Sequence, residues 1–233
     1  MKKIIKTIFY VITIVMTISV IICTVIGLQG YKMYKDTISK TSIDDRIEQL
    51  KSNDNYLELN KIPEYFKDAI VAVEDHRFKS HGGIDIISTC RAILNNIKAM
   101  SIVEGGSTIT QQLAKNLYFS QEQDFVRKVA ELFAALDLEK DYSKDDILEF
   151  YLNTIYFGNG YYGIYDASMG YFNKPPKDLT IKEATLLAGI PNAPSVYALT
   201  ENPDLAKQRQ AQVLDAMVNY NYITDQEAEN ILE

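Results

Sequence analysis

The chain has 233 residues, a formal net charge of −7, 47% hydrophobic residues and 24% charged residues. This composition is typical of a folded chain, and the length allows one domain with an additional segment. The acidic balance disfavours general nucleic-acid binding, so we expect no nucleic-acid partner. Cys23 and Cys90 lie in unlike surroundings, and the two histidines show no zinc-binding spacing, so we expect neither a disulfide nor a metal site of that kind.

The N-terminal region is apolar. Residues 7–31 contain no charged side chain, and such a run is long enough to cross the ~30 Å hydrocarbon core of a membrane as a helix. The lysines within residues 1–6 favour a cytoplasmic N-terminus. We therefore predict a cytoplasmic tail over 1–6, a transmembrane helix over 7–31, and an extracellular remainder. A cleaved signal peptide is the alternative, although it usually has a shorter apolar core and a small-residue cleavage site.

Residues 32–54 are polar and mixed, which predicts a connector with a short helix at 42–51, followed by a short strand at 56–59. Residues 55–233 lack sustained two-residue alternation and carry helical spacing, which predicts a mainly α domain. The expected helices start at Pro63, 85, 107 or 108, 123 and 143, and further ones follow the capping boxes at 180–183 and 224–227.

Glu74 ends the first predicted helix of this domain and borders its apolar stripe of Phe66, Ile70 and Val73. A carboxylate shielded by apolar neighbours has a raised pKa, as a general base requires. Spacing alone favours the simpler interpretation, which is an acidic cluster at a helix end.

Gly105 and Gly106 lead into Ser107 and Thr108 at a predicted helix start. Free backbone N–H groups at such a start suit an anion such as phosphate. Gln111 and Lys115, four residues apart, share one helix face. The alternative is an ordinary capping box whose amides face solvent.

A third cluster, Arg127-Lys128-x-x-Glu131, lies on the helix predicted over 123–140. Glu131 lies off the apolar stripe of that helix, whose members are Phe125, Val129, Leu132, Phe133 and Leu136. The cluster is either a solvated, salt-bridged face or a set of charges facing a diphosphate. Glu139 lies nearer the stripe and is expected to be a buried structural acid.

Together these segments resemble glycosyltransferase family 51, the peptidoglycan glycosyltransferases. The resemblance covers about residues 55–220. The matching segments, all in the family's order, are Glu74-Asp75-His76-Arg77-Phe78-x-x-His81-x-Gly83, Gly105-Gly106-Ser107-Thr108-Ile109-Thr110-Gln111-Gln112-Leu113-x-Lys115-Asn116, Arg127-Lys128-x-x-Glu131, Ile147-Leu148-Glu149-x-Tyr151-Leu152-Asn153 with Tyr156-Phe157-Gly158, and Glu183-Ala184-x-Leu186-Leu187-Ala188-Gly189-x-Pro191.

The resemblance implies a lysozyme-like, two-lobed α fold whose smaller jaw lobe, about residues 84–104, lies at the membrane. It implies a polymerase that transfers the growing glycan chain from undecaprenyl diphosphate to the 4-hydroxyl of lipid II, with inversion. Glu74 would be the general base and Glu131 the second essential carboxylate. The substrate-binding residues would be Arg91, Ser107, Thr108, Gln111, Gln112, Lys115, Arg127, Lys128 and Asn153.

The implied partners are lipid II, the growing glycan chain, membrane lipid and further cell-wall synthesis proteins. No cofactor is required, although a divalent cation, magnesium or manganese, is compatible with a diphosphate; no ligands for it can be assigned. No Ser-x-x-Lys occurs, so we expect no penicillin-binding serine of that type.

Two departures from the family pattern occur. Gln123 stands where many members have arginine, and Asn173 replaces glycine after Tyr171-Phe172, a change that left-handed backbone tolerates. Because of the first departure, a catalytically impaired cell-wall scaffold remains an alternative function for this chain. A glycan-cleaving enzyme of lysozyme-like fold is the other alternative, although the cations and the glycine-led helix start favour a diphosphate substrate.

Overall fold

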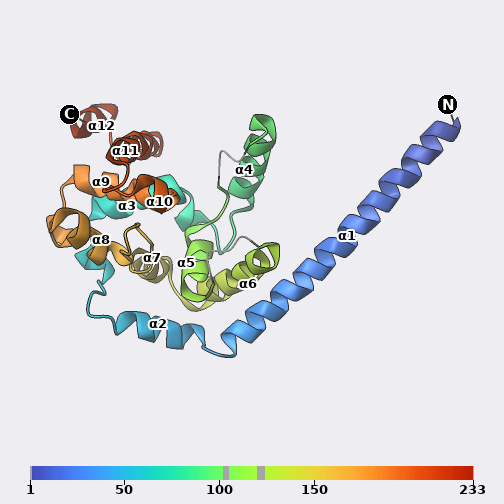
Figure 1. The fold of residues 1–233 in the computed structure, drawn as a ribbon, viewed down its shortest axis with the longest axis horizontal. Coiled ribbons are helices and arrows are strands. Elements are labelled where there is room, and N and C mark those ends of the chain that lie inside the picture. Colours follow the sequence, from blue (N-terminus) through green and yellow to red (C-terminus); the bar gives the residue numbers. More distant parts are fainter. Residues whose placement is uncertain (1, 102–104, 120–123, 233) are drawn as a thin grey trace.

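The computed structural model describes residues 2–101, 105–119 and 124–232. Their α-helices (Figure 1) are α1 (Lys2–Ile38), α2 (Ile43–Lys51), α3 (Glu64–Glu74), α4 (Ile86–Ala99), α5 (Ile109–Tyr118), α6 (Phe125–Asp141), α7 (Lys144–Leu152), α8 (Gly163–Phe172), α9 (Ile181–Gly189), α10 (Pro194–Tyr197), α11 (Pro203–Asn219) and α12 (Asp225–Leu232). Short 3₁₀ helices are η1 (Leu59–Lys61), η2 (Phe78–Ser80), η3 (Pro176–Asp178) and η4 (Ile190–Asn192).

The mainly α prediction is confirmed. Within the described residues the only β pairing is an isolated antiparallel bridge between Tyr156 and Tyr162. The strand predicted at 56–59 is wrong, because residues 56–58 are irregular and Leu59 begins η1. Tertiary hydrogen bonds to α7, described below, hold this segment. They determine its conformation, so its alternation of apolar and polar residues does not produce a strand.

Capping boxes define the starts of α2, α5, α7 and α9. Each of four hydroxyl side chains accepts a hydrogen bond from the backbone N–H three residues on, and that third residue returns one to the cap backbone. These caps are Ser42, Thr108, Ser143 and Thr180. Asp85 caps α4 by accepting from the N–H groups of Ile87 and Ser88. Local sequence chemistry therefore fixes where these helices begin.

The N-terminal helix is longer than predicted. An 18-residue window within Lys3–Ile38 has a mean hydropathy of 2.7, and the helix is long and apolar enough to cross a membrane. However, α1 continues seven residues beyond Tyr31, through the region expected to be a connector. The reason is tertiary packing, since Tyr34 is buried and its hydroxyl donates a hydrogen bond to Asp137 of α6. The connector starts only after Ile38.

The C-terminal end of α1 packs against α6 (Figure 1). The Phe133 ring lies 5.0 Å from that of Tyr31 and 5.7 Å from that of Tyr34. A Cβ added to Gly30 would lie 2.5 Å from Cβ of Val129, so only glycine permits this approach. The membrane helix is thereby joined directly to the domain.

This packing explains why the apolar stripe of α6 is not its most buried face. The buried residues of α6 are Ala130, Glu131, Ala134, Ala135 and Leu138. Members of the predicted apolar stripe instead contact α1 or remain exposed, as Phe125 does at 79%. Small alanines allow α6 to approach the core closely, and apolar periodicity cannot tell the core from a docked membrane helix.

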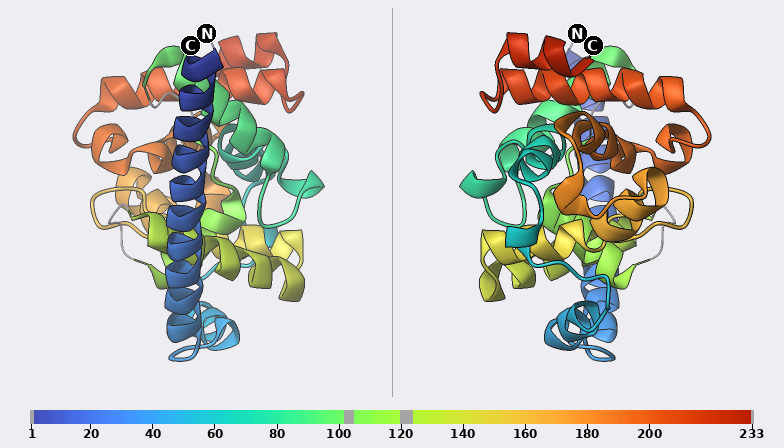
Figure 2. Two further views of the ribbon diagram at one scale, coloured as in Figure 1. Left: turned by 90° about the vertical axis from the view of Figure 1, so that its right-hand side faces the viewer. Right: turned by 90° about the vertical axis from the view of Figure 1, so that its left-hand side faces the viewer.

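The domain core forms where α3, α9 and α11 pack together and α5 packs on α6 and α7. Its largest fully buried side chains are Tyr151, Phe66, Phe78, Phe150 and Phe157. Figure 2 shows these helices gathered into one body, beside which α1 runs as an unbroken rod.

Helix α4 projects from this body on the side towards which the N-terminal half of α1 extends (Figure 1). Only Ala92 of this helix is buried. We call α4 and its C-cap Met100 the arm; the exposed apolar side chains of the arm are Ile86, Ile87, Ile93, Leu94, Ile97 and Met100. Such an apolar surface marks an interaction site for lipid or protein. The rest of the predicted jaw, residues 102–104, lies outside the described residues.

Candidate active site

A cavity of about 450 Å³ opens between the end of α3, helices α5 and α11, and the arm. Its charged and polar lining side chains are Glu74, His76, Arg91, Ser107, Gln112, Lys115, Asn192, Arg209 and Tyr220. Five predicted site residues, which come from three separate sequence segments, thus meet in one cavity: Glu74, Arg91, Ser107, Gln112 and Lys115.

Glu74 is the last residue of α3, and its carboxylate is fixed on one side. Gln112 Nε2 donates a hydrogen bond of 2.8 Å to Oε2 of Glu74. The Tyr151 hydroxyl donates one of 2.9 Å to Oε1 of Gln112, which orients the amide. The other oxygen of Glu74, Oε1, is shielded from solvent and has no hydrogen-bond partner. One oxygen is thus held while the other can accept a proton.

The groups around Glu74 shift the pKa of its carboxyl in opposite directions. Burial raises the pKa of the Glu74 carboxyl, which is the largest effect. The hydrogen bond from Gln112 and the positive charges of Arg209 and Lys115 lower this pKa, while the charge of Asp75 raises it; the net change is upward. A carboxylate in this state is a stronger base than one in water.

Glu131 is fully buried on α6 and holds two cations. Its Oε2 lies 3.0 Å from Lys128 Nζ, and its Oε1 lies 3.3 Å from Arg127 Nε. The same Lys128 Nζ donates a hydrogen bond of 2.8 Å to Oγ of Ser107. The solvated-face interpretation of this cluster is therefore wrong, because the carboxylate is shielded and its partners reach the segment before α5.

Lys115 adds a third cation to this region. Burial lowers the pKa of its ammonium group; nearby Glu131 raises it, and Lys128 and Arg127 lower it further. Three cations outnumber the one buried carboxylate, so the region attracts a multiply charged anion. Arg127 and Lys128 also line a separate hollow of about 420 Å³ with Asp124 and Phe125, at the start of α6.

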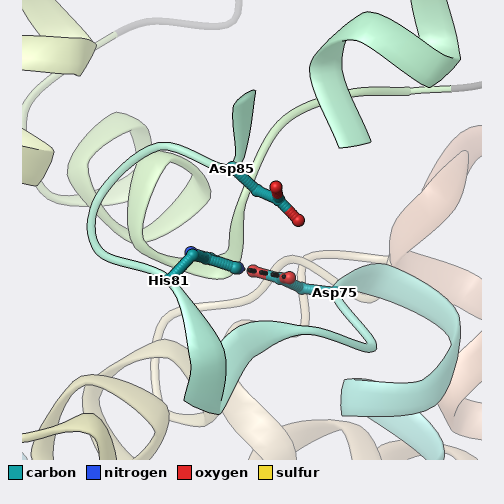
Figure 3. A group of neighbouring side chains, drawn as sticks. All are labelled: Asp75, His81 and Asp85. Atoms are coloured by element: carbon teal, nitrogen blue, oxygen red, sulfur yellow. Dashed lines mark hydrogen bonds and ion pairs between the residues drawn. The ribbon is translucent and has the colours of Figure 1, made fainter. Parts of the chain in front are cut away.

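Three further side chains, those of Asp75, His81 and Asp85, lie close together (Figure 3). Asp75 Oδ1 lies 2.8 Å from Nε2 of His81, and Asp75 Oδ2 accepts a 3.0 Å hydrogen bond from the Ile109 N–H. Asp85 accepts from Arg77 Nε at 2.9 Å and from the N–H groups and hydroxyl at the start of α4. All four carboxylate oxygens are already occupied by protein donors.

These hydrogen bonds join separate chain segments. Burial raises the pKa of Asp85, but hydrogen bonds from Ser88 and Arg77 outweigh it and bring this pKa to about 2. Asp75 directly follows Glu74, so its bonds to His81 and Ile109 hold the end of α3 against the start of α5. The position of Glu74 relative to Gln112 depends on that link.

Five of the predicted binding residues do not line the cavity: Arg127 and Lys128, described above, and Thr108, Gln111 and Asn153. Thr108 is buried, and its hydroxyl donates to the Gly83 carbonyl oxygen at 2.8 Å, while Gln111 completes the cap of α5. Asn153 instead clamps Leu57 through two hydrogen bonds of 2.9 Å, one to each backbone group. In this structure these contacts support the fold, and the assignment of Asn153 to substrate binding stays a prediction. Glu139, half-buried, accepts from Thr110 at 2.5 Å and from Lys144 at 2.7 Å, as a structural acid does.

Sequence reasoning missed Arg209, which enters the cavity from α11. Gly189 makes room for it, because a Cβ there would lie 2.9 Å from Cγ of Arg209. His76 and Tyr220 were also missed; their rings stack 4.0 Å apart at 6° in the cavity wall. The glycine was visible in the fifth motif, but no local pattern connects it to a residue twenty positions later.

The sequence profile of the family described as Transglycosylase matches residues 42–218. Penicillin-binding protein 1F of Bacillus subtilis (strain 168) is 51% identical over 170 residues, which are 73% of this chain and 24% of that protein. Penicillin-binding protein 1A of Neisseria flavescens is 44% identical over 178 residues, 76% of this chain and 22% of that protein. This chain thus spans about a quarter of the length of these relatives.

Among solved structures, penicillin-binding protein 1A of Haemophilus influenzae aligns with a TM-score of 0.46 at 22% identity, over 76% of this chain and 17% of that one, a likeness too slight to add to the assignment. The profile match covers most of the chain and includes every motif on which the resemblance was based. The chain therefore belongs to the transglycosylase family.

Proposed function

We propose that this protein is a membrane-anchored peptidoglycan glycosyltransferase that polymerises lipid II. The observation that carries the proposal is the pairing of two features in one place. Glu74 presents a solvent-shielded oxygen with no partner. Lys115 and Ser107 line the same cavity, and Ser107 accepts a hydrogen bond from Lys128, which pairs with the buried Glu131. A base beside an anion-binding wall suits glycosyl transfer from a diphosphate.

In the proposed reaction, Glu74 Oε1 removes the proton from the 4-hydroxyl of the GlcNAc of lipid II. The resulting oxygen attacks C1 of the terminal sugar of the growing chain. The bond from C1 to the diphosphate oxygen breaks, and undecaprenyl diphosphate leaves with the electron pair. Attack opposite to the leaving group inverts the anomeric carbon from α to β. The raised pKa of Glu74 assists the proton transfer.

The cations support the departure of the diphosphate. Negative charge develops on the leaving oxygens, and fixed positive charges in a shielded site stabilise it. We assign this role to Lys115 and Lys128, with Glu131 holding Lys128 in place through the 3.0 Å ion pair. Arg91, exposed on the arm, would contact the diphosphate of the incoming lipid II.

A divalent ion does not fit the protein groups around Glu131. Both oxygens of this carboxylate face cations, Arg127 and Lys128, and the sole cluster of potential metal ligands in the described residues is Asp75, His81 and Asp85, whose carboxylate oxygens are occupied. We therefore derive no step through a metal.

The membrane arrangement follows from α1 and the arm. We infer that α1 spans the membrane with its N-terminal lysines in the cytoplasm. The domain then lies outside, where Ile87, Leu94 and Ile97 of α4 enter the lipid surface. With the arm inserted in this way, the cavity could receive the diphosphate of a lipid substrate while the polyprenyl chain of that substrate stays in the bilayer.

Product analysis with labelled lipid II tests the proposal. The full chain in liposomes is expected to convert lipid II into glycan polymer. Shortening of preformed glycan with no use of lipid II would support the glycan-cleaving alternative. A folded protein that does neither would support the scaffold, for which Gln123, outside the described residues, is the motivating departure.

A further inference from the structure

The membrane helix contacts α6 at the turn that carries Arg127 and Lys128. Gly30 of α1 lies against the carbonyl oxygen of Val126 and the side chain of Val129. In the sequence, Arg127 and Lys128 lie between these two valines. A movement of α1 that displaces the valines therefore also moves the backbone from which both cations project.

The contact with α1 and the buried Glu131 lie on opposite faces of α6. At about 100° per residue, Glu131 lies about 170° around the helix axis from the midpoint of Val126 and Val129. Glu131 pairs with Lys128, whose Nζ donates a hydrogen bond of 2.8 Å to Ser107 Oγ. Helix α1 thus supports α6 on the face opposite to this polar network.

The two helices approach too closely for any side chain at residue 30. A Cβ there would lie 2.5 Å from Cβ of Val129 and 2.8 Å from the backbone oxygen of Val126. Carbon atoms in ordinary contact are about 3.5–4.0 Å apart, so an alanine would separate the helices by about 1 Å. A backbone oxygen cannot rotate away as the end of a long side chain can, so the helices themselves would have to move.

A second contact fixes α1 further along α6. Tyr34 is buried, and its hydroxyl donates a hydrogen bond to Asp137. The ring of Phe133 packs between this bond and the Gly30 contact. Contacts at both ends of this stretch determine the register of α1 along α6 as well as the distance between the two helices.

We propose that Gly30 and Tyr34 are positioning residues for catalysis, which dock α1 on α6 and thereby hold Lys128 in place beside Ser107. The inference rests on the proposed function, in which Lys128 stabilises the departing diphosphate. The membrane helix then supports the active site in addition to anchoring the domain. A displacement of about 1 Å is large enough to matter, because such a misplacement, even from a remote mutation, can lower a rate about 10²-fold.

Gly30→Ala tests this role, and Gly27→Ala is its matched control. Gly27 lies on the same helix, but a Cβ added there would have no heavy atom within 4 Å. Both changes add one methyl group to the membrane helix, so they alter anchoring equally. The full-length variants would be assayed in liposomes for kcat and KM with lipid II, for flotation with the liposomes, and for Tm.

The proposal predicts that Gly30→Ala lowers kcat by about tenfold or more while the protein still floats with the liposomes. Tyr34→Phe, which removes only the hydroxyl, should lower kcat less. Both changes are then repeated in Lys128→Met. Because coupled positions have non-additive effects, Gly30→Ala should cost less than about twofold in that background. Gly27→Ala should leave kcat unchanged in both backgrounds.

Three outcomes would overturn the proposal. The first is a kcat for Gly30→Ala within about twofold of wild type, and the second is an equal loss in Lys128→Met, which would show general destabilisation instead of an effect through Lys128. The third is an equal loss in Gly27→Ala.

A wild type that makes no polymer would refute the proposed function instead. Titration with inorganic pyrophosphate would then decide the positioning role without the reaction. Weaker pyrophosphate binding by Gly30→Ala than by Gly27→Ala would support the role of the docked helix, and equal affinities would refute it.

Discussion

Replacing Lys128 by methionine removes one positive charge from the proposed diphosphate site while keeping much of the side-chain length. Its Nζ lies 2.8 Å from Ser107 Oγ, so a phosphate oxygen contacting this serine would be about 4 Å from the ammonium. A unit charge at that distance is worth about 4 kcal/mol at the effective dielectric constant of a protein surface. Loss of one preorganised group at a site of developing charge typically costs about 2.7–4 kcal/mol, or 10²–10³ in kcat. We expect a decrease of this size in polymerisation.

The assay is the initial rate of lipid II consumption at saturating substrate, with thermal unfolding measured in parallel. Lys140→Met is the matched control, because this lysine is on the same helix and its side chain is 78% exposed. Ser107→Ala, which removes the hydrogen-bond partner but keeps the cation, should reduce the rate less. Lys128→Met with more than a tenth of wild-type activity would refute the assignment, since the charge would then not face the leaving group.

Three further predictions concern groups around the cavity. Gln112→Leu should move the acidic limb of the pH–rate profile to higher pH, because the hydrogen bond from Gln112 lowers the pKa of Glu74; Tyr151→Phe, which leaves Gln112 in place, should move it less. Glu74→Gln should raise the Tm at pH 7. Because the folded protein raises this pKa, folding is penalised above it, and the Tm gain should vanish as pH falls through the raised value. Asn153→Ala should lower the free energy of unfolding by about 2 kcal/mol by leaving the Leu57 backbone groups without their partner, whereas exposed Asn60→Ala should not.

Each of these has a contrary outcome. An unmoved pH profile in Gln112→Leu would show that the amide does not set the protonation of the base. An unchanged or lower Tm in Glu74→Gln, or a gain that persists at low pH, would contradict the burial argument. A stable Asn153→Ala with a raised KM for lipid II would return this residue to the substrate groove.

Local signals in the sequence predicted the helix starts well. Ser42, Thr108, Ser143 and Thr180 each cap the expected helix, because a capping box depends only on residues within one turn. The contacts of those helices could not be read in the same way. The apolar stripe of α6 is visible in the sequence, yet the sequence does not show that its Val129 and Phe133 contact α1. Periodicity reports an apolar face and does not identify its neighbour.

The site was predicted where the motifs are dense and missed where they are sparse. Glu74, Gln112 and Lys115 come together as the resemblance implies. Asn153 is a motif residue whose side chain bonds the Leu57 backbone, a contact that the motif alone does not reveal. Arg209 was missed because its role depends on the packing of α11 against Gly189, a long-range contact.

The most direct test of the central claim is the rate of glycan polymerisation by Glu74→Gln compared with wild type, in liposomes containing lipid II. Glutamine keeps the shape of the side chain and can still accept the bond from Gln112 but cannot remove a proton. Loss of about 10²–10⁴-fold in rate, from a protein that remains folded, is the predicted result. Polymerisation within tenfold of wild type would show that Glu74 is not the base and would contradict the account.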